Sequence, residues 1–131
     1  MTAREPVWIR REALVSLHDR TLALHGGPAG IRDEGLLESA LQRPINRFLY
    51  QQVTDLSVLA GTYAVGIASN HPFIDGNKRA AYQALLLFLA LNGQPLQADS
   101  VDATLTMRAV AAGQIDIDPL ARWIRANSSK T

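Results

Sequence analysis

Residues 56–91, LSVLAGTYAVGIASNHPFIDGNKRAAYQALLLFLAL, decide the fold, because two long apolar stretches flank one short polar segment. The first stretch follows Thr54 or Asp55, either of which can cap a helix, and it carries a stripe of glycine, alanine and serine that allows close packing. The second stretch, residues 78–91, is apolar on almost every side, as in a helix at the centre of a domain. We therefore expect two central helices joined by a polar loop.

Towards the N-terminus, leucines at helical spacing predict a helix over residues 11–24 that ends at Gly26–Pro28. Asp33 then offers an N-cap for a second helix, which we expect to stop at Pro44. The following segment, Ile45–Val53, has aromatic and β-branched residues without a clear helical period. It is predicted to be an extended segment or a short hairpin.

Towards the C-terminus, residues 100–112 predict another helix closed by Gly113. Asp118–Pro119 is typical of an N-cap followed by proline at the first helical position, and the last helix should reach Ala126. The polar residues 127–131 are expected to be a frayed tail. The fold class is therefore an all-α, compact helical bundle with a short extended flap before the central helices.

The composition limits the kinds of function. With 131 residues the chain fits one domain, residues 1–131, and 47% hydrophobic with 19% charged residues is the balance of a soluble globular protein. Thirteen basic and twelve acidic residues give a net charge of +1, so no bulk field favours nucleic acid. No cysteine is present, and no apolar run is long enough for a membrane span or a signal peptide. We expect a cytoplasmic protein.

The segment HPFIDGNKR, residues 71–79, concentrates the chemistry. Gly76 and Asn77 tolerate tight backbone conformations, so amides of the first helical turn could point together into a phosphate cradle. Lys78 and Arg79 would oppose the helix dipole in that turn, and a bound anion would relieve this repulsion.

Two further side chains of this segment suit phosphate chemistry. Asp75 is a carboxylate beside the expected phosphate site, as holding Mg²⁺ requires. His71 has a neutral form near pH 7 and suits the role of general base for a hydroxyl. Taken singly, each of these residues is better interpreted as part of a helix cap and a local hydrogen-bond network. Phe73 is better interpreted as a core anchor and Pro72 as a stiffener of the loop.

HPFIDGNKR resembles the signature of the Fic/Doc family: a histidine, an aromatic residue two positions on, an acidic residue, a small residue, asparagine and arginine. The resemblance extends from LHDRTLALHGG through GIRDEGLLESALQRP to LLLFLALNG, in the order seen in Doc proteins. It implies a small helical enzyme that uses ATP and Mg²⁺.

Two chemistries compete within this family. Lys78 stands where the AMP-transferring branch has a second glycine, and Tyr82 where that branch has a second arginine. Both departures favour the Doc branch, for which the resemblance implies an inverted ATP, transfer of the γ-phosphate to a protein hydroxyl, and elongation factor Tu as the target. Translation would then stop. AMP transfer is the alternative.

The resemblance also implies a role for each matching residue. His71 would accept the proton of the target hydroxyl, and Asp75 would hold Mg²⁺ and orient the attacking group. Asn77, Lys78 and Arg79 would bind the phosphates, with Gly76 contributing only backbone. The segment Ile45–Val53 matches in position the flap that aligns the target beside the histidine.

Partners follow from the same resemblance. No inhibitory Ser-x-x-x-Glu helix is recognisable, so a separate, Phd-like antitoxin is expected to restrain a toxin of this kind. A different interpretation is a non-catalytic module that only binds an antitoxin. His18 and His25 make no metal-ligand spacing with His71, and His18 is the better candidate for helix packing.

Overall fold

The computed structural model describes residues 4–129, which form six helices and no β-sheet. The helices are α1 (Arg11–His25), α2 (Glu34–Gln51), α3 (Leu56–Asn70), α4 (Asn77–Leu91), α5 (Ser100–Ala111) and α6 (Ile117–Ala126). Within the described part of the chain, none of them is both long and apolar enough to cross a bilayer. The predicted all-α fold is confirmed.

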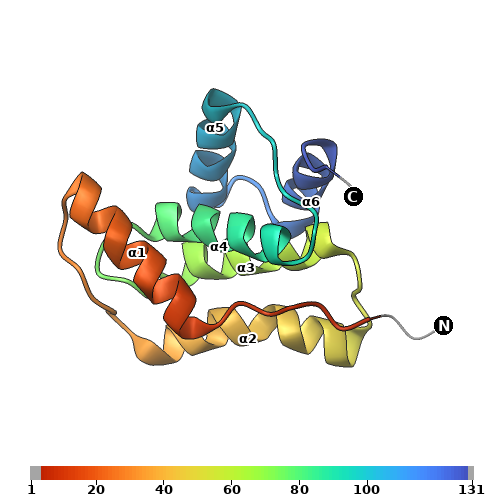
Figure 1. Cartoon of the computed structure of the whole chain (residues 1–131), viewed down its shortest axis with the longest axis horizontal. Helices are drawn as coiled ribbons and strands as arrows, with labels where there is room; N and C mark the ends of the chain where they lie inside the picture. Colours follow the sequence, from red (N-terminus) through yellow and green to blue (C-terminus); the bar gives the residue numbers. More distant parts are fainter. Residues whose placement is uncertain (1–3, 130–131) are drawn as a thin grey trace.

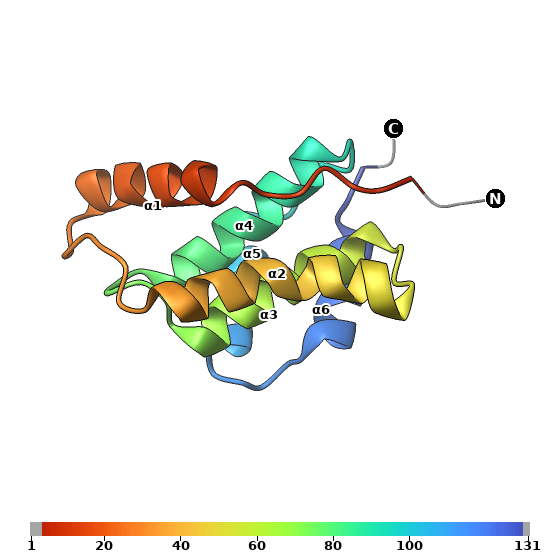
Figure 2. The same cartoon turned by 90° about the horizontal axis from the view of Figure 1, so that it is seen from below.

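Helices α3 and α4 lie side by side at the centre of the molecule (Figures 1 and 2). Helix α2 covers one side of this pair, and α5 and α6 cover the opposite side. Of the two central helices, α1 packs chiefly against α4, near the end where α3 passes into α4. This arrangement leaves the α3–α4 loop at one end of the bundle, within reach of α1 and of the segment between α1 and α2.

The small residues of α3 explain how one helix can have neighbours on several sides. A methyl group on Gly61 would lie 3.5 Å from the carbonyl oxygen of Ile117 in α6, and one on Gly66 would lie 3.5 Å from the Cα of Ala40 in α2. Both glycines therefore sit where another backbone comes close. The expectation of close packing along this helix is confirmed.

The N-terminal segment closes one side of the core. Trp8 stacks on Phe88 with ring centroids 5.9 Å apart, and the backbone N–H of Ile9 donates to the hydroxyl of Tyr63 at 3.2 Å. Tyr63 is fully buried, and burial raises the pKa of its hydroxyl to about 12, because the charged form would lose its hydration. Trp8 and Ile9, which precede α1, are thus part of the packed domain.

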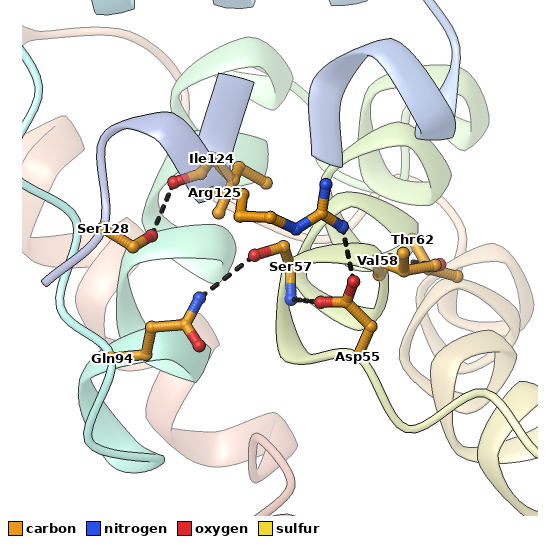
Figure 3. Close-up of polar contacts among 8 residues, drawn as sticks. All are labelled: Asp55, Ser57, Val58, Thr62, Gln94, Ile124, Arg125 and Ser128. Atoms are coloured by element: carbon orange, nitrogen blue, oxygen red, sulfur yellow. Dashed lines mark hydrogen bonds and ion pairs between the residues drawn. The ribbon is translucent and has the colours of Figure 1, made fainter. Parts of the chain in front are cut away.

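Polar contacts fasten the start of α3 to the C-terminal half of the chain (Figure 3). Asp55 caps α3 by accepting from the N–H of Ser57 at 2.8 Å, and its other oxygen pairs with Arg125 of α6. Gln94, just after α4, donates to the hydroxyl of Ser57 at 3.0 Å. The predicted cap is therefore Asp55, and it also joins two distant helices.

The prediction that the second helix stops at Pro44 is wrong. Helix α2 runs through Pro44 to Gln51, so Ile45–Val53 is no extended flap or hairpin but mostly helix. Its apolar stripe continues through Leu41, Pro44 and Phe48 at helical spacing, against the core. This burial outweighs the one backbone hydrogen bond that proline cannot donate.

Two expectations near the C-terminus also change. Asp116, and not Asp118, is the N-cap of α6, and Pro119 occupies the third helical position, where its missing N–H has no intrahelical partner to lose. Residues 127–129 are held against residues 95–97, with Gln97 N–H donating to Asn127 O at 2.7 Å and Ser129 N–H to Pro95 O at 3.0 Å. The predicted frayed tail is thus hydrogen-bonded there, and residues 130 and 131 lie outside the described residues.

Candidate active site

The loop of residues 71–76, called here the signature loop, joins α3 to α4 and borders a pocket of about 470 Å³. All the site residues expected from the sequence line this pocket: His71, Asp75, Gly76, Asn77, Lys78 and Arg79. Ala68, Ile74 and Ala111 complete the lining. The structure therefore brings a histidine, a carboxylate, two cations and a helix N-terminus to one concave surface.

His71 ends α3 in an unusual backbone conformation. Its φ of 49° and ψ of 55° are left-handed, and only Gln52 shares a positive φ among the described non-glycine residues. The N–H of His71 donates to Ile67 O at 3.2 Å, which ends the helix, while its imidazole is exposed towards the pocket. A base for an incoming hydroxyl needs this accessibility.

The segment before α2 holds the outer side of the signature loop. Ile74 N–H donates to Gly30 O at 3.1 Å, and Ile31 forms an isolated antiparallel bridge with Phe73. Phe73 is buried, as expected of a core anchor. The loop is thereby fixed to a segment about forty positions earlier in the chain.

The side chain of Asn77 holds the loop from the α4 side. Its Oδ1 accepts from Phe73 N–H at 2.9 Å, and its Nδ2 donates to Phe73 O at 3.0 Å. These bonds use one donor and one lone pair of the amide, so the second N–H of Nδ2 and the backbone N–H of Asn77 are the donors that remain for a phosphate.

His18 of α1 supports the loop from inside. Its ring is fully buried, lies 4.1 Å from the Phe73 ring, and places Nε2 2.9 Å from Asp75 O. Burial lowers the pKa of His18, because the imidazolium would be desolvated. A neutral ring that donates from Nε2 to the carbonyl fits this environment, and the expected packing role of His18 is confirmed.

Asp75 presents an exposed carboxylate beside this support. Its Oδ1 accepts from the N–H of Gly76 at 2.8 Å, and its Oδ2 faces Gly27, where a Cβ would come within 2.5 Å. Residues 4–129 contain no cluster of three or more acidic or histidine side chains that could hold a metal. One exposed carboxylate such as Asp75 suits Mg²⁺ when phosphates supply further ligands, which is usual for nucleotide-bound Mg²⁺.

The N-terminus of α4 faces the same pocket. The N–H groups of Asn77, Lys78 and Arg79 have no hydrogen-bond acceptor within residues 4–129, and the first N–H bond of the helix is Ala80 to Gly76 O at 2.8 Å. The side chains of Lys78 and Arg79 are exposed. Free amides with two cations form a site for a phosphate group.

A second pocket continues from the same two cations. It measures about 430 Å³ and lies between α4 and α5. Lys78, Arg79, Tyr82, Ala103 and Met107 are among its lining residues. A ligand with a phosphate end and a flat apolar end could occupy both pockets across Lys78 and Arg79.

The sequence analysis assigned nothing to Arg32, whose guanidinium lies at the end of α3. Its Nε donates to His71 O at 2.7 Å and its Nη2 to Asn70 O at 2.9 Å. These partners are 39 and 38 positions away. No local sequence pattern predicts such a contact, because it forms only when distant segments pack together.

Comparisons with known proteins show which family the chain is similar to. The model of the Fic/DOC family matches residues 8–89, which include the whole signature loop. The chain is 38% identical over 117 residues to the protein named Protein kinase doc from Escherichia phage P1, covering 89% of this chain and 92% of that one. It is also 38% identical over 102 residues to Toxin Doc from Mycolicibacterium smegmatis, covering 73% and 76%. Since the family model matches well over half of its residues and a relative 38% identical covers 89% of it, the chain belongs to the Fic/DOC family.

Proposed function

We propose that this protein transfers the γ-phosphate of ATP to a hydroxyl group of another protein, with His71 as the general base. The observation that carries the proposal is the shared pocket, in which the exposed imidazole of His71 and the free N-terminus of α4 border the same space. A hydroxyl beside His71 could thus meet a phosphoryl group bound at α4.

The transfer needs one proton acceptor and several anion-stabilising groups. The imidazole of His71 takes the proton of the target hydroxyl, while the oxygen of that hydroxyl forms a bond to the γ-phosphorus. The bond between that phosphorus and the bridging oxygen breaks, and ADP leaves. The N–H groups of the first turn of α4, with Lys78 and Arg79, stabilise the charge on the phosphoryl oxygens.

Asp75 has two tasks in this proposal. Its Oδ2, which has no hydrogen-bond donor among residues 4–129, would hold Mg²⁺ together with the phosphates of ATP. Bound Mg²⁺ supplies charge neutralisation to the leaving phosphates. The same carboxylate lies in the pocket with His71 and would orient the attacking hydroxyl.

Two observations favour phosphate transfer over AMP transfer. The flexible Lys78 stands where the AMP-transferring branch has a glycine, and it borders both pockets, so its side chain occupies room along the path of the phosphates. A relative that covers most of the chain bears the name Protein kinase doc. The second pocket, beside Tyr82 and Met107, would take the nucleoside.

We further propose that the protein is the toxin of a toxin–antitoxin pair acting in the cytoplasm. Its target would be elongation factor Tu, and a separate Phd-like antitoxin would restrain it. The relative named Toxin Doc supports the toxin role. Growth arrest on expression without an antitoxin, relieved by His71→Ala, is the expected result in bacteria, and normal growth would contradict it.

A labelling reaction tests the chemistry. Purified protein, Mg²⁺ and elongation factor Tu are incubated with ATP labelled at either the γ- or the α-phosphorus, and His71→Ala is the control. We expect label on the factor only from the γ-position, and none with His71→Ala. Label from the α-position would mean AMP transfer. Absence of both labels, in a bacterial lysate as well, would favour a module that only binds a partner.

A further inference from the structure

The guanidinium of Arg32 lies across the C-terminal end of α3. It donates from Nε to His71 O at 2.7 Å and from Nη2 to Asn70 O at 2.9 Å. The last carbonyls of a helix lack partners within the helix and carry its partial negative charge, so a cation with two donors suits them. Arg32 therefore satisfies the end of α3 at the residue that carries the exposed imidazole.

The backbone of Arg32 continues the same contact. Its N–H donates to Pro72 O at 2.7 Å, and the N–H of the next residue, Asp33, donates to the same oxygen at 3.1 Å. Arg32 thus binds three successive carbonyl groups, those of residues 70, 71 and 72. No other residue in the described part of the chain bonds to the carbonyl of His71 through a side chain.

His71 depends on such restraint because its backbone is left-handed, at φ 49°. A residue with a Cβ is disfavoured there relative to glycine, and the surrounding contacts must maintain the conformation. The direction in which the imidazole leaves the chain follows from this backbone. If the Asn70–Pro72 carbonyls were free to rotate, the ring would sample directions away from the pocket.

We propose that Arg32 is a positioning residue, which fixes the backbone of His71 so that the imidazole faces the phosphate site. The inference rests on the proposed role of His71 as base. Arg32 touches neither pocket and makes no direct contact with the reacting groups. Its effect should therefore appear in the rate of the chemical step and not in the binding of ATP.

Substitutions at Arg32 separate positioning from simple helix capping. Arg32→Lys keeps the charge at the end of α3 but loses the planar pair of donors, and Arg32→Gln loses the charge as well. Arg43 is the matched control, since it is an exposed arginine of α2 whose side chain has no hydrogen bond or ion pair to residues 4–129. If Arg32 acted through charge alone, Arg32→Lys would behave like the wild type.

Steady-state kinetics give the first test. We expect Arg32→Gln and Arg32→Lys to lower kcat by about 10- to 100-fold with little change in the KM for ATP, because small displacements of a catalytic group have effects of this order. Arg43→Gln should match the wild type. Millimolar guanidinium should restore part of the kcat of Arg32→Ala. An unchanged kcat in folded Arg32→Lys and Arg32→Gln would overturn the proposal.

The imidazole signals in NMR spectra give a second test that requires no activity. The chain has three histidines, so the His71 signals are identified by their loss in His71→Ala. We expect these signals to shift in Arg32→Gln and to stay in place in Arg43→Gln. Unmoved His71 signals would refute positioning even if the kinase reaction exists. If the His71 signals shift in Arg32→Gln although the wild-type protein transfers no phosphate, positioning is supported and the proposed reaction fails.

Discussion

Asn77 and Phe73 form a closed pair of hydrogen bonds: the Asn77 side chain accepts from the Phe73 N–H at 2.9 Å and donates to its carbonyl at 3.0 Å. The amide thus replaces the partner strand that an extended residue would have in a sheet. The side chain of an asparagine in a family signature would ordinarily be expected to bind the ligand. Here its side chain shapes the loop, and its backbone N–H faces the pocket.

The first prediction concerns this pair. Asn77→Ala removes both bonds and should lower the free energy of unfolding by about 1–3 kcal/mol, measured by urea denaturation. Asn77→Asp keeps the acceptor but places a carboxylate oxygen against Phe73 O. Its free energy of unfolding should therefore fall by a similar amount. Asn46→Ala, at an exposed position of α2, should change stability by less than about 0.5 kcal/mol. Equal losses at residues 46 and 77 would contradict the interpretation.

The second prediction compares two glycines with the same backbone. Gly76 has φ 75° and Gly113 has φ 74°, but a Cβ on Gly76 would lie 2.8 Å from Cε1 of His18, whereas one on Gly113 meets nothing within 4 Å. Gly113→Ala should therefore show the backbone effect alone, about 1–2 kcal/mol. Gly76→Ala should lose about 1–3 kcal/mol more from overpacking against His18. Thermal and urea unfolding measure the stability of both variants. Equal losses in Gly76→Ala and Gly113→Ala would mean that the His18 ring moves aside at no cost.

A third prediction tests the placement of Asp75 through the neighbouring segment. A Cβ on Gly27 would lie 2.5 Å from Asp75 Oδ2, so Gly27→Ala should push the carboxylate aside. Gly26→Ala is the control, since it also carries a positive φ and meets nothing within 4 Å. We expect Gly27→Ala to require more Mg²⁺ for half-maximal phosphate transfer. If both variants show the same Mg²⁺ dependence, Asp75 either moves without consequence or holds no ion.

The fourth prediction concerns pH. Burial raises the pKa of Tyr63 to about 12 from its usual 10.0. Between these values the unfolded chain has released the phenolic proton and the folded chain has kept it, so the free energy of unfolding falls as pH rises from 10 to 12 and is fully retained below 10. In Tyr63→Phe this decline should be shallower. Tyr50→Phe, at a position that is 78% exposed, should follow the wild type in the same urea titrations.

Most of the fold could be predicted because its signals are local. The caps at Asp33 and Asp55, the glycines after α1 and α4, and the apolar spacing of each helix all act within a few residues. The end of α2 could not be predicted, because proline is ordinarily a helix breaker. The burial of Pro44 and the packing of Phe48 against the core, a tertiary effect, outweigh that local rule.

The site divides in the same way. The polar and charged residues that line its pocket all fall between His71 and Arg79, so one sequence segment reveals them. Their supports are distant: Arg32 bonds across 38 and 39 positions and His18 across 57. Such contacts depend on how α1 and the start of α2 pack against the loop. These contacts follow no periodicity or spacing, so the sequence pattern does not predict them.

The left-handed backbone of His71 has a practical consequence for anyone who wishes to handle a chemically silent version of this protein. The hydrogen bonds that hold the signature loop are made to the main chain of His71 and to Phe73. None of these bonds involves the imidazole of His71. Alanine would remove the base but strain the turn, whereas asparagine visits this conformation readily. His71→Asn is therefore the substitution best suited to yield abundant, correctly folded and inert material for crystallisation or for capturing partners.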